Sequence, residues 1–528
     1  MSDSLDHFDL IVIGGGATGS GVALDATLRG LKTLLVEKND FAEGTSSRST
    51  KLVHGGVRYL EAAVKKLDID QFNLVKEGLK ERYRLLKNAP HLAHSVTLIT
   101  PLYKWYEIPY MFAGLALYDL ISGKKRLGKS QIVGKKEISE IFPYVKKEGL
   151  KGGVRYFDGA FNDSRMAIAL LQSAKEKGCN VKNYTEVIEF VYENSKITGV
   201  RVKDKIAKKI YDIKADFVVN ASGPFVDRIR KLDDKSSKEI LETSSGIHIV
   251  LDKKFLPNDE GIMIPKTEDG RVLFMLPYLD KCLVGTTDEK EDLQDNPKVK
   301  DKDIEYLLRH IKKYFSVDIT KNDILSSWSG LRPLVVSSDK NSTKELVREH
   351  YIEESKSGLV SIVGGKWTTY RKMAEEVVDH ISSKYNRKKL HTCETKSYKL
   401  VGSQENLSKI KDKLDKLDLN KKVREHLFSF YGDRALRIVE IAKDKGFELI
   451  NENYPVLKAE IHYSVEEEFV KKPLDFLVRR VNLGLIDKET AKSSLLVVCK
   501  ELQDIFGWSE KEYVFELNEA KSRLESSI

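Results

Sequence analysis

The sequence predicts an α/β fold of several domains, with a parallel sheet, an antiparallel sheet and a C-terminal helical region in different parts of the chain. At residues 8–29 a short β-branched run leads into a glycine-rich turn and a helical pattern, which is typical of a buried parallel strand and its following helix. At residues 244–290 short apolar runs separated by Gly, Pro and Asp indicate an antiparallel sheet. From about residue 388 charged helical patterns replace the strand patterns.

The composition is that of a globular protein with more than one core. A chain of 528 residues with 41% hydrophobic content predicts two or three domains. The 89 basic and 80 acidic residues give a net charge of +9 and mostly alternate in sign. This pattern favours a solvated surface, then an anionic lipid surface or anionic substrate, and predicts no nucleic-acid partner. Four dispersed cysteines without a CxxC pair predict a reducing compartment and no metal site.

The N-terminus and the longest apolar run predict neither an export signal nor a membrane span. MSDSLDHFDL lacks the features of a secretory signal and of a transit peptide. The run at residues 108–121 contains Asp119 and is shorter than the ~20 residues that a spanning helix needs. Aromatic residues precede and overlap this run, and basic residues follow it: Lys124, Lys125, Arg126 and Lys129. A segment lying on a membrane interface and a core helix followed by a basic loop explain this composition equally well.

Gly14, Gly16 and Gly19 fall in GxGxxG spacing on a strand-to-helix turn. The first glycine permits the tight turn, the second lets a pyrophosphate approach the backbone, and the third lets the helix pack on the strand. The next strand ends in Glu37, 18 residues after Gly19, close to the spacing expected for an acid that binds a ribose diol. This context predicts a Rossmann-like dinucleotide-binding unit, with a purely structural turn as the alternative.

Two later turns favour FAD over a nicotinamide cofactor. One apolar strand stops at the small-residue turn of Ala221 and Gly223, and another stops at Gly364 and Gly365 before a helical pattern. A long two-part cofactor needs several such approaches of bare backbone, whereas NAD usually needs one. Although residues 221–224 alone could be an ordinary loop, the three turns together predict a discontinuous, glutathione-reductase-like FAD-binding domain.

A polar loop at residues 44–61 is the next candidate for function. Its hydroxyls and backbone can satisfy phosphate and flavin edges, and Arg58 beside Tyr59 can hold an anion bidentately. The predicted FAD contacts along the whole chain are Gly14, Gly16, Gly19, Glu37, Thr45, Ser46, Ser47, Lys51, Leu52, Val187, Ala221, Gly223, Gly365, Lys366, Trp367 and Thr368.

Two polar residues interrupt predicted strands. His248 lies among apolar neighbours, so a hydrogen-bonded structural histidine and a functional one are equally good interpretations. Arg332, in WSGLRPLV, needs an anionic partner if it is buried or lies in a cleft.

Seven motifs resemble those of FAD-dependent, quinone-linked glycerol-3-phosphate dehydrogenases, in the order and spacing of that family. They cover residues 8 to about 380, and HLFSFYGDRA and DFLVRR extend the likeness into the helical tail. The motifs are IGGGATGSGVALDATLRGLKTLLVEKNDFAEGTSSRSTKLVHGGVRYLE, FDGAFNDSRM, VNASGPFVD, GIHIVL, VGTTD, WSGLRPLV and VGGKWTTYRKMAEE.

This resemblance implies oxidation of sn-glycerol 3-phosphate to dihydroxyacetone phosphate, with hydride passing from C2 to the flavin N5 and electrons passing to a membrane quinone. It also implies that Arg58, Tyr59, Arg332 and His248 bind the substrate. The sequence lacks the presequence and the calcium-loop pattern of mitochondrial members. We therefore expect a peripheral protein on the inner face of the cytoplasmic membrane, and a homodimer is left open.

The chemistry of this substrate suggests roles for individual residues. Arginine suits the phosphate dianion, and a base must receive the hydroxyl proton as hydride leaves C2. His248 is the first candidate base and Lys366 the second, while Arg332 could polarise the hydroxyl. The alternatives are a glycerol-3-phosphate oxidase that reduces O2 to H2O2, an NAD-linked dehydrogenase, and a scaffold protein that holds flavin without catalysis.

The predicted FAD-binding domain is split into three segments by two insertions. The predicted ranges are 1–95, 151–235 and 331–387 for FAD binding, 96–150 for a segment facing substrate or membrane, 236–330 for the substrate-binding sheet, and 388–528 for the helical domain.

Overall fold

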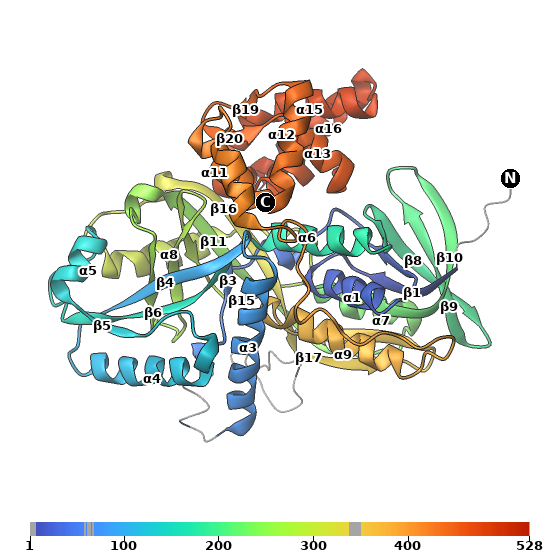
Figure 1. Cartoon of the computed structure of the whole chain (residues 1–528). Helices are drawn as coiled ribbons and strands as arrows, with labels where there is room; N and C mark the ends of the chain where they lie inside the picture. The colour runs from blue at the N-terminus through green and yellow to red at the C-terminus, as the bar shows by residue number, and fades with distance from the viewer. Residues whose placement is uncertain (1–6, 58–59, 61–64, 66–67, 337–349, 527–528) are drawn as a thin grey trace.

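The computed structural model describes residues 7–57, 60, 65, 68–336 and 350–526. Two sheets lie side by side, each with its own helices, and the C-terminal helices, orange to red in Figure 1, cover the junction between them. The predicted fold class is confirmed, because a largely parallel sheet, a largely antiparallel sheet and a helical C-terminal region all occur.

The first sheet has the N-terminal strand near its centre. Its strand order is β17-β18-β10-β1-β2-β7, and β9 joins β8 to β10. The strands from β18 to β7 run parallel to one another, whereas β17 and β9 are antiparallel to their neighbours. The strands are β1 (His7–Ile13), β2 (Thr33–Val36), β7 (Asn180–Lys182), β8 (Thr185–Glu193), β9 (Lys196–Asp204), β10 (Lys209–Asn220), β17 (His350–Glu354) and β18 (Leu359–Gly364).

Both faces of this sheet are covered, which explains the continuous apolar run of β1. Leu10 and Val12 pack against α1, α6 and α9 on one face, while Ile11 and Ile13 pack against β8, β9 and α7 on the other. The covering helices are α1 (Ala17–Leu28), α6 (Asp163–Glu176), α7 (Val226–Asp233) and α9 (Tyr370–Ser382). The ends of the parallel strands are therefore held rigidly on a buried core.

The second sheet gathers strands from distant parts of the chain. Its order is β15-β11-β14-β13-β12-β4-β6-β3, with β16 on β11 and β5 on β6. Among the described strand pairs of this sheet, only β12 and β4 are parallel. The strands are β3 (Leu52–Val53), β4 (Ala93–Leu102), β5 (Gln131–Gly134), β6 (Gly152–Phe161), β11 (Leu241–Asp252), β12 (Glu260–Ile264), β13 (Leu273–Tyr278), β14 (Lys281–Gly285), β15 (Glu289–Lys290) and β16 (Ile324–Val335).

This sheet is wider than the range 236–330 predicted for it. Strand β6, which the sequence-based ranges assign to FAD binding, is hydrogen bonded to β3, β4 and β5 in the second sheet. The helices next to this sheet are α3 (Ile69–Asn88), α4 (Glu107–Ser122), α5 (Lys135–Ile141) and α8 (Asp301–Tyr314). Helix α4 covers the apolar run at residues 108–121, and no helix among the described residues is long and apolar enough to cross a membrane.

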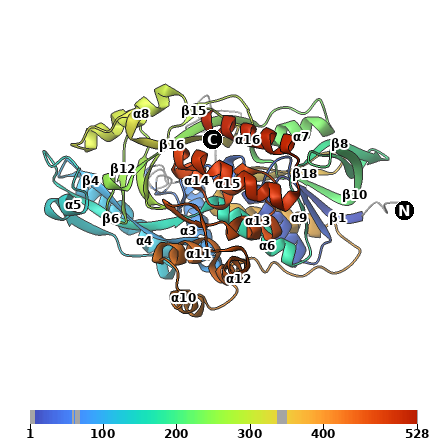
Figure 2. The ribbon, with the colours of Figure 1, turned by 90° about the horizontal axis from the view of Figure 1, so that it is seen from above.

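The C-terminal region packs on the second sheet through an extensive apolar core that includes Trp328, Phe476 and Leu483. Seen from above in Figure 2, its helices lie across both sheets and the helices that cover them. Its elements are α10 (Leu407–Asp415), α11 (Lys421–Tyr431), α12 (Ala435–Lys445), β19 (Leu449–Asn451), β20 (Tyr454–Leu457), α13 (Ala459–Glu467), the π-helix η8 (Asp475–Arg480), α14 (Leu483–Ile486), α15 (Lys488–Phe506) and α16 (Glu510–Glu525).

The expectation that this region holds no strands was wrong in one place. Strands β19 and β20 form a small antiparallel pair. The turn between them is stabilised by a hydrogen bond from the Asn453 backbone N–H to the Asn451 side-chain oxygen, 3.0 Å long. Asparagine in such a position favours a turn, and the strands are too short to give a clear alternating pattern.

Candidate active site

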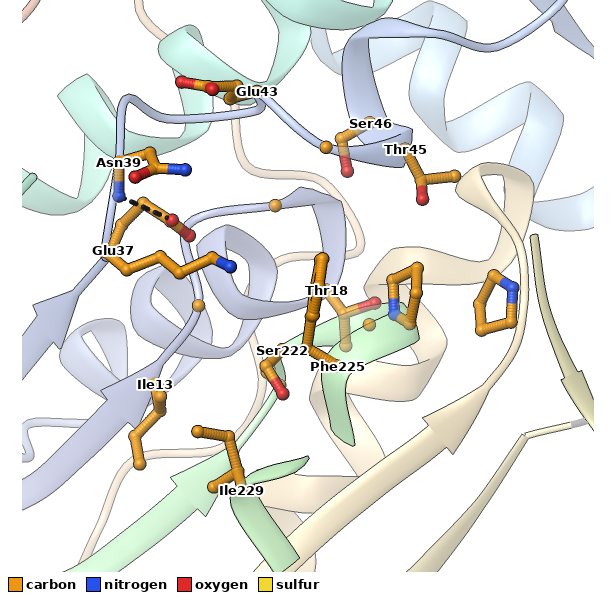
Figure 3. A pocket seen from close by; sticks show the side chains of 18 of the residues that line it. Ile13, Thr18, Glu37, Asn39, Glu43, Thr45, Ser46, Ser222, Phe225 and Ile229 are labelled. Atoms are coloured by element: carbon orange, nitrogen blue, oxygen red, sulfur yellow. Dashed lines mark hydrogen bonds between the residues drawn. The ribbon is translucent and has the colours of Figure 1, made fainter. Parts of the chain in front are cut away.

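The three glycine-containing turns meet at one cavity of about 420 Å³ at the carboxyl ends of the parallel strands. Figure 3 shows side chains from several of these segments converging on it. The predicted contacts that line the cavity are Gly14, Gly16, Glu37, Thr45, Ser46, Val187, Ala221, Gly223, Gly365, Lys366 and Trp367. A crevice at this end of a parallel sheet is the usual binding place for a dinucleotide.

Close backbone approach explains the glycines of the first turn. Gly14 has a φ of +111°, and a Cβ there would lie 2.6 Å from the Ala221 carbonyl oxygen. A Cβ on Gly19 would lie 1.9 Å from the Gly14 carbonyl oxygen. Gly19 thus holds α1 against the turn and does not line the cavity, so the N-terminus of α1 can face a phosphate group.

Glu37 is fixed at the end of β2 by two backbone amides. Its Oε2 accepts a hydrogen bond from Gly15 N–H at 2.8 Å. Its Oε1 accepts one from Asn39 N–H at 3.0 Å, which Figure 3 draws as a dashed line. Burial raises the pKa of Glu37, and these amides oppose that shift. A carboxylate has about four lone-pair positions, so Glu37 can still accept hydrogen bonds from a ribose diol.

The 3-10 helix η1 (Thr45–Ser47) ties the first turn to two other segments. Ser46 Oγ accepts a hydrogen bond from Ala17 N–H at 2.9 Å, and the Ser46 carbonyl oxygen accepts one from Trp367 Nε1 at 2.9 Å. Thr45 Oγ1 donates to the Leu331 carbonyl oxygen on β16 at 2.5 Å. The polar loop therefore connects the cavity to the second sheet.

Some predicted FAD contacts do not line this cavity: Gly19, Ser47, Lys51, Leu52 and Thr368. The Lys51 ammonium is buried and donates to Asp163 Oδ1 at 2.6 Å and to the Ser47 carbonyl oxygen at 2.7 Å. Leu52 pairs with β6, and Thr368 Oγ1 bonds the His54 carbonyl oxygen at 3.4 Å. These residues therefore stabilise the loop at residues 44–61 without lining the cavity.

His248 and Arg332 lie on neighbouring strands of the second sheet, on the same face. His248 is paired with Trp328, and Arg332 is paired with Ser244. Two glycines make room for their side chains. A Cβ on Gly285 would lie 2.1 Å from His248 Cδ2, and a Cβ on Gly246 would lie 2.1 Å from Arg332 Nη2. Neither His248 nor Arg332 lines the cavity itself, although Pro333 and Lys366 do.

The Arg332 guanidinium is held in place by hydrogen bonds, and the side chain is 20% exposed. Its Nη1 donates to Asp288 Oδ1 at 3.1 Å, and its Nη2 donates to Thr286 Oγ1 and to the Thr287 carbonyl oxygen, both at 3.0 Å. A guanidinium oriented in this way can bind a phosphate in fixed geometry.

His248 is 2% exposed. Burial lowers its pKa well below 6.5, and the positive charges of Arg332 and Lys51 lower it further. Its Nε2 lies 2.9 Å from Thr50 Oγ1, and its ring stacks on Trp328. Its Nδ1 is buried without a hydrogen-bond partner among the described residues. An unsatisfied ring nitrogen favours a functional histidine over a purely structural one.

Thr50 was missed by the sequence analysis as a partner of His248, because 198 residues separate the two positions. Only its place in the polar loop could have drawn attention to it. Asn39, Phe225 and Arg228 also line the cavity without having been predicted. The predicted substrate residues Arg58 and Tyr59 lie outside the described residues.

The parallel sheet with three backbone bends around one cavity, beside a second sheet that carries polar residues, defines an FAD-dependent oxidoreductase. The family described as FAD dependent oxidoreductase matches residues 9–371. The family described as C-terminal domain of alpha-glycerophosphate oxidase matches residues 393–513.

Individual proteins define the family more closely. A probable mitochondrial glycerol-3-phosphate dehydrogenase from Caenorhabditis elegans is 41% identical over 99% of this chain and 74% of its own length. The mitochondrial enzyme SDP6 from Arabidopsis thaliana is 39% identical over 99% of this chain and 86% of its own length. The structure of glycerol-3-phosphate dehydrogenase from Bacillus halodurans with FAD superposes with a TM-score of 0.81 at 32% identity, over 100% of this chain and 96% of that one. The chain belongs to the family of FAD-dependent glycerol-3-phosphate dehydrogenases, and the predictions of this family and of FAD are confirmed.

Proposed function

We propose that this protein oxidises sn-glycerol 3-phosphate to dihydroxyacetone phosphate and passes the electrons to a membrane quinone. The observation that carries the proposal is the shared sheet face of Arg332 and His248, joined to the FAD cavity by the loop of Thr45 and Thr50. A cation and a neutral imidazole are the two groups that a phosphorylated secondary alcohol requires. The names of the relatives agree with this substrate.

The described residues fit FAD. The bare turns at Gly14, Gly223 and Gly365 leave room for a long ligand, Glu37 suits a ribose, and α1 directs its N-terminus at the turn. When bound, FAD supplies the acceptor for the hydride that leaves C2 of the substrate. Lys366 and Trp367 line the cavity near its third turn, and a lysine there suits negative charge on the cofactor side.

Arg332 would bind the phosphate and so orient the substrate. Its contacts with Thr286, Thr287 and Asp288 fix the plane of the guanidinium before the ligand arrives, which reduces the entropy lost on binding. We propose that Arg58 and Tyr59 complete this phosphate site, as their sequence motif predicts.

His248 would accept the hydroxyl proton. It is held neutral by burial and by the charges of Arg332 and Lys51, and only the neutral ring can accept a proton. A phosphate dianion beside Arg332 would offset one of these charges and raise the pKa of His248 in the complex, making it a better base. Thr50 would hold the ring orientation through Nε2.

Anaerobic addition of sn-glycerol 3-phosphate to the purified yellow protein tests this function. We expect the flavin absorbance to bleach, because the substrate reduces bound FAD stoichiometrically, whereas glycerol at the same concentration bleaches it far more slowly because it lacks the phosphate that binds Arg332. Persistence of the absorbance would contradict the proposal and would leave a protein that holds flavin without catalysis. An NAD-linked dehydrogenase would be colourless as purified.

The electron acceptor has one alternative, O2, as in a glycerol-3-phosphate oxidase. The match of the C-terminal region to the domain of alpha-glycerophosphate oxidase keeps this alternative open. Reoxidation of the bleached protein separates the two. Fast reaction with a soluble quinone analogue and slow formation of H2O2 support the dehydrogenase, and the reverse order of rates supports the oxidase.

An exposed apolar surface on and before α4 supports attachment to anionic lipid on the inner face of the cytoplasmic membrane. Trp105 is 73% exposed and Leu120 is 76% exposed, and Tyr106 and Tyr110 are exposed between them. The basic residues of 124–129 follow directly. In Figure 1 this helix lies at the bottom of the molecule, opposite the C-terminal helices. Aromatic and basic side chains together are typical of a membrane interface.

Reversal of three charges tests this surface. Changing Lys124, Lys125 and Arg126 to Glu is expected to weaken binding to vesicles of anionic lipid by at least about tenfold, because each basic residue near such a surface contributes about 1 kcal/mol. Cosedimentation with vesicles measures the effect. The matched control is Lys409, Lys411 and Lys413 to Glu on α10, which should bind like the wild type. Equal binding by both variants would refute this surface.

A further inference from the structure

We propose that the C-terminal region positions the FAD-binding loop at residues 40–46. Two carboxylates on this loop, Asp40 and Glu43, form ion pairs with arginines of the C-terminal region. These positioning residues are Arg479, Arg480 and Arg523. The family comparison gives the region a name and no role in FAD binding, and none of these arginines lines the cavity.

The loop at 40–46 forms one wall of the cavity. Its residues Ala42 to Ser46 all line the cavity. Phe41 lies beneath the first glycine turn, because a Cβ on Gly15 would lie 2.4 Å from Phe41 Cδ1. Ala42 N–H donates to the Gly15 carbonyl oxygen at 3.0 Å. A shift of this loop would therefore move the first turn and the wall together.

Asp40 is the inner attachment point. Arg480 binds both of its oxygens, with Nη1 to Oδ2 at 2.7 Å and Nη2 to Oδ1 at 2.8 Å. Arg479 Nε donates to Oδ2 at 2.5 Å. All three side chains are buried. Burial alone would raise the pKa of Asp40, but the two arginines hold it below its usual range, so the carboxylate stays charged and paired.

Glu43 is the outer attachment point. Arg523, on the final helix α16, donates from Nη2 to Glu43 Oε1 at 2.8 Å, and Arg479 lies 3.7 Å from Oε2. Figure 3 shows the Glu43 carboxylate on the far side of its loop from Thr18 and Ser222. Burial would raise the pKa of Glu43, and the arginine charges lower it overall. The last helix of the chain thus contacts the back of the FAD-binding loop.

A π-helix makes the double contact with Asp40 feasible. The segment η8 (Asp475–Arg480) directs two successive arginines at one carboxylate. Its first residue accepts hydrogen bonds from Arg479 Nη2 at 2.8 Å and from Tyr184 OH at 2.7 Å. Tyr184 precedes the cavity residues 185–188. The segment η8 therefore contacts both Asp40, at the start of the loop, and Tyr184, next to cavity residues 185–188.

Arg523 offers the cleanest test, because its side chain is 36% exposed and its loss leaves the inner pairs intact. Arg523→Ala is expected to raise the Kd for FAD by about tenfold, as loss of a partly buried charge-assisted bond frees the loop. FAD titration of the deflavinated full-length protein, followed by quenching of flavin fluorescence, measures this Kd. With FAD in excess, the KM for glycerol 3-phosphate should stay within about twofold, because Arg523 contacts neither His248 on β11 nor Arg332 on β16.

Arg434→Ala is the matched control. Arg434 also joins the C-terminal region to a helix of the first sheet, α6, through one arginine–glutamate pair, with Nη2 2.6 Å from Glu176 Oε1. It does not contact the loop at residues 40–46. It should leave the Kd for FAD unchanged. Arg523→Lys, which keeps the charge, should recover part of the affinity. Equal Kd values for wild type and Arg523→Ala, or equal losses in Arg523→Ala and Arg434→Ala, would overturn the proposal.

A second variant tests the inner contact. Asp40→Asn keeps the size of the side chain and removes its charge, so the expected loss of FAD affinity exceeds that of Arg523→Ala. Thermal unfolding of the protein with and without FAD shows whether the variant folds. If Asp40→Asn fails to fold, Arg523→Ala still decides the proposal. A folded Asp40→Asn protein with wild-type FAD affinity would overturn it.

Discussion

Replacing Arg332 with Ala is expected to lower kcat/KM for sn-glycerol 3-phosphate by about a thousandfold while FAD stays bound. Truncating one member of a desolvated charge pair costs roughly 2–5 kcal/mol, and about 4 kcal/mol corresponds to three factors of ten in rate. Most of the change should appear in KM if Arg332 only binds the phosphate. Steady-state kinetics with a quinone analogue, together with the flavin absorbance of the purified variant, measure both quantities.

Glycerol separates the two roles open to Arg332. Because glycerol lacks the phosphate, Arg332→Ala and wild type should oxidise it at the same slow rate if Arg332 binds phosphate. If Arg332→Ala also oxidises glycerol more slowly than the wild type, the guanidinium polarises the substrate hydroxyl. The matched control is Arg155→Ala on β6 of the same sheet, where Arg155 is paired with Glu137 and Glu260. Unchanged kcat and KM in Arg332→Ala would remove Arg332 from the substrate site.

The sequence predicted that the three glycine-containing turns meet at one cavity, because its signals are local. Each glycine turn follows its own apolar strand, and parallel strands of one sheet bring their carboxyl ends to one edge. The turns at Gly14, Ala221 and Gly365 therefore had to meet once they shared a sheet. Gly19 is also local, since its role is contact with the preceding turn.

Contacts between distant segments could not be predicted in this way. Strand β4 lies next to β12 in a parallel pair, which no alternation pattern specifies. Lys51 was predicted to contact FAD because it lies in a polar loop, but Asp163, 112 residues later, binds its ammonium in the interior. The ion pairs of Asp40 with Arg479 and Arg480 join positions about 440 residues apart. Such pairs depend on how the two sheets and the C-terminal region pack together. Composition and the periodicity of hydrophobic residues do not encode this packing.

Replacing His248 with Ala or Gln is expected to lower kcat by roughly 10²- to 10⁴-fold, the usual contribution of a general base, with FAD still bound. Gln keeps a hydrogen-bond acceptor and cannot take up the proton. A similar loss of kcat in both variants therefore indicates that His248 takes up the proton. Near-normal kcat in His248→Gln would indicate that His248 only orients the substrate. His310→Gln on α8 is the control, because both ring nitrogens of His310 have partners, the Tyr306 carbonyl oxygen at 2.8 Å and the Glu268 N–H at 3.1 Å.

The pH dependence of His248 gives a second, independent readout. Activity requires the neutral ring and is lost as the pH falls through the pKa of His248. In the free protein, burial and the charges of Arg332 and Lys51 hold that pKa well below 6.5, so protonation of His248 should not lower kcat/KM until the pH is below 6.5, and any earlier decline belongs to the substrate phosphate, whose second pKa is about 6. The substrate phosphate offsets the charge of Arg332, so the acid limb of kcat should lie at higher pH than that of kcat/KM. His248→Ala should abolish the acid limb of kcat. A His248→Ala protein with the wild-type kcat and the wild-type pH profile would show that another group takes up the proton.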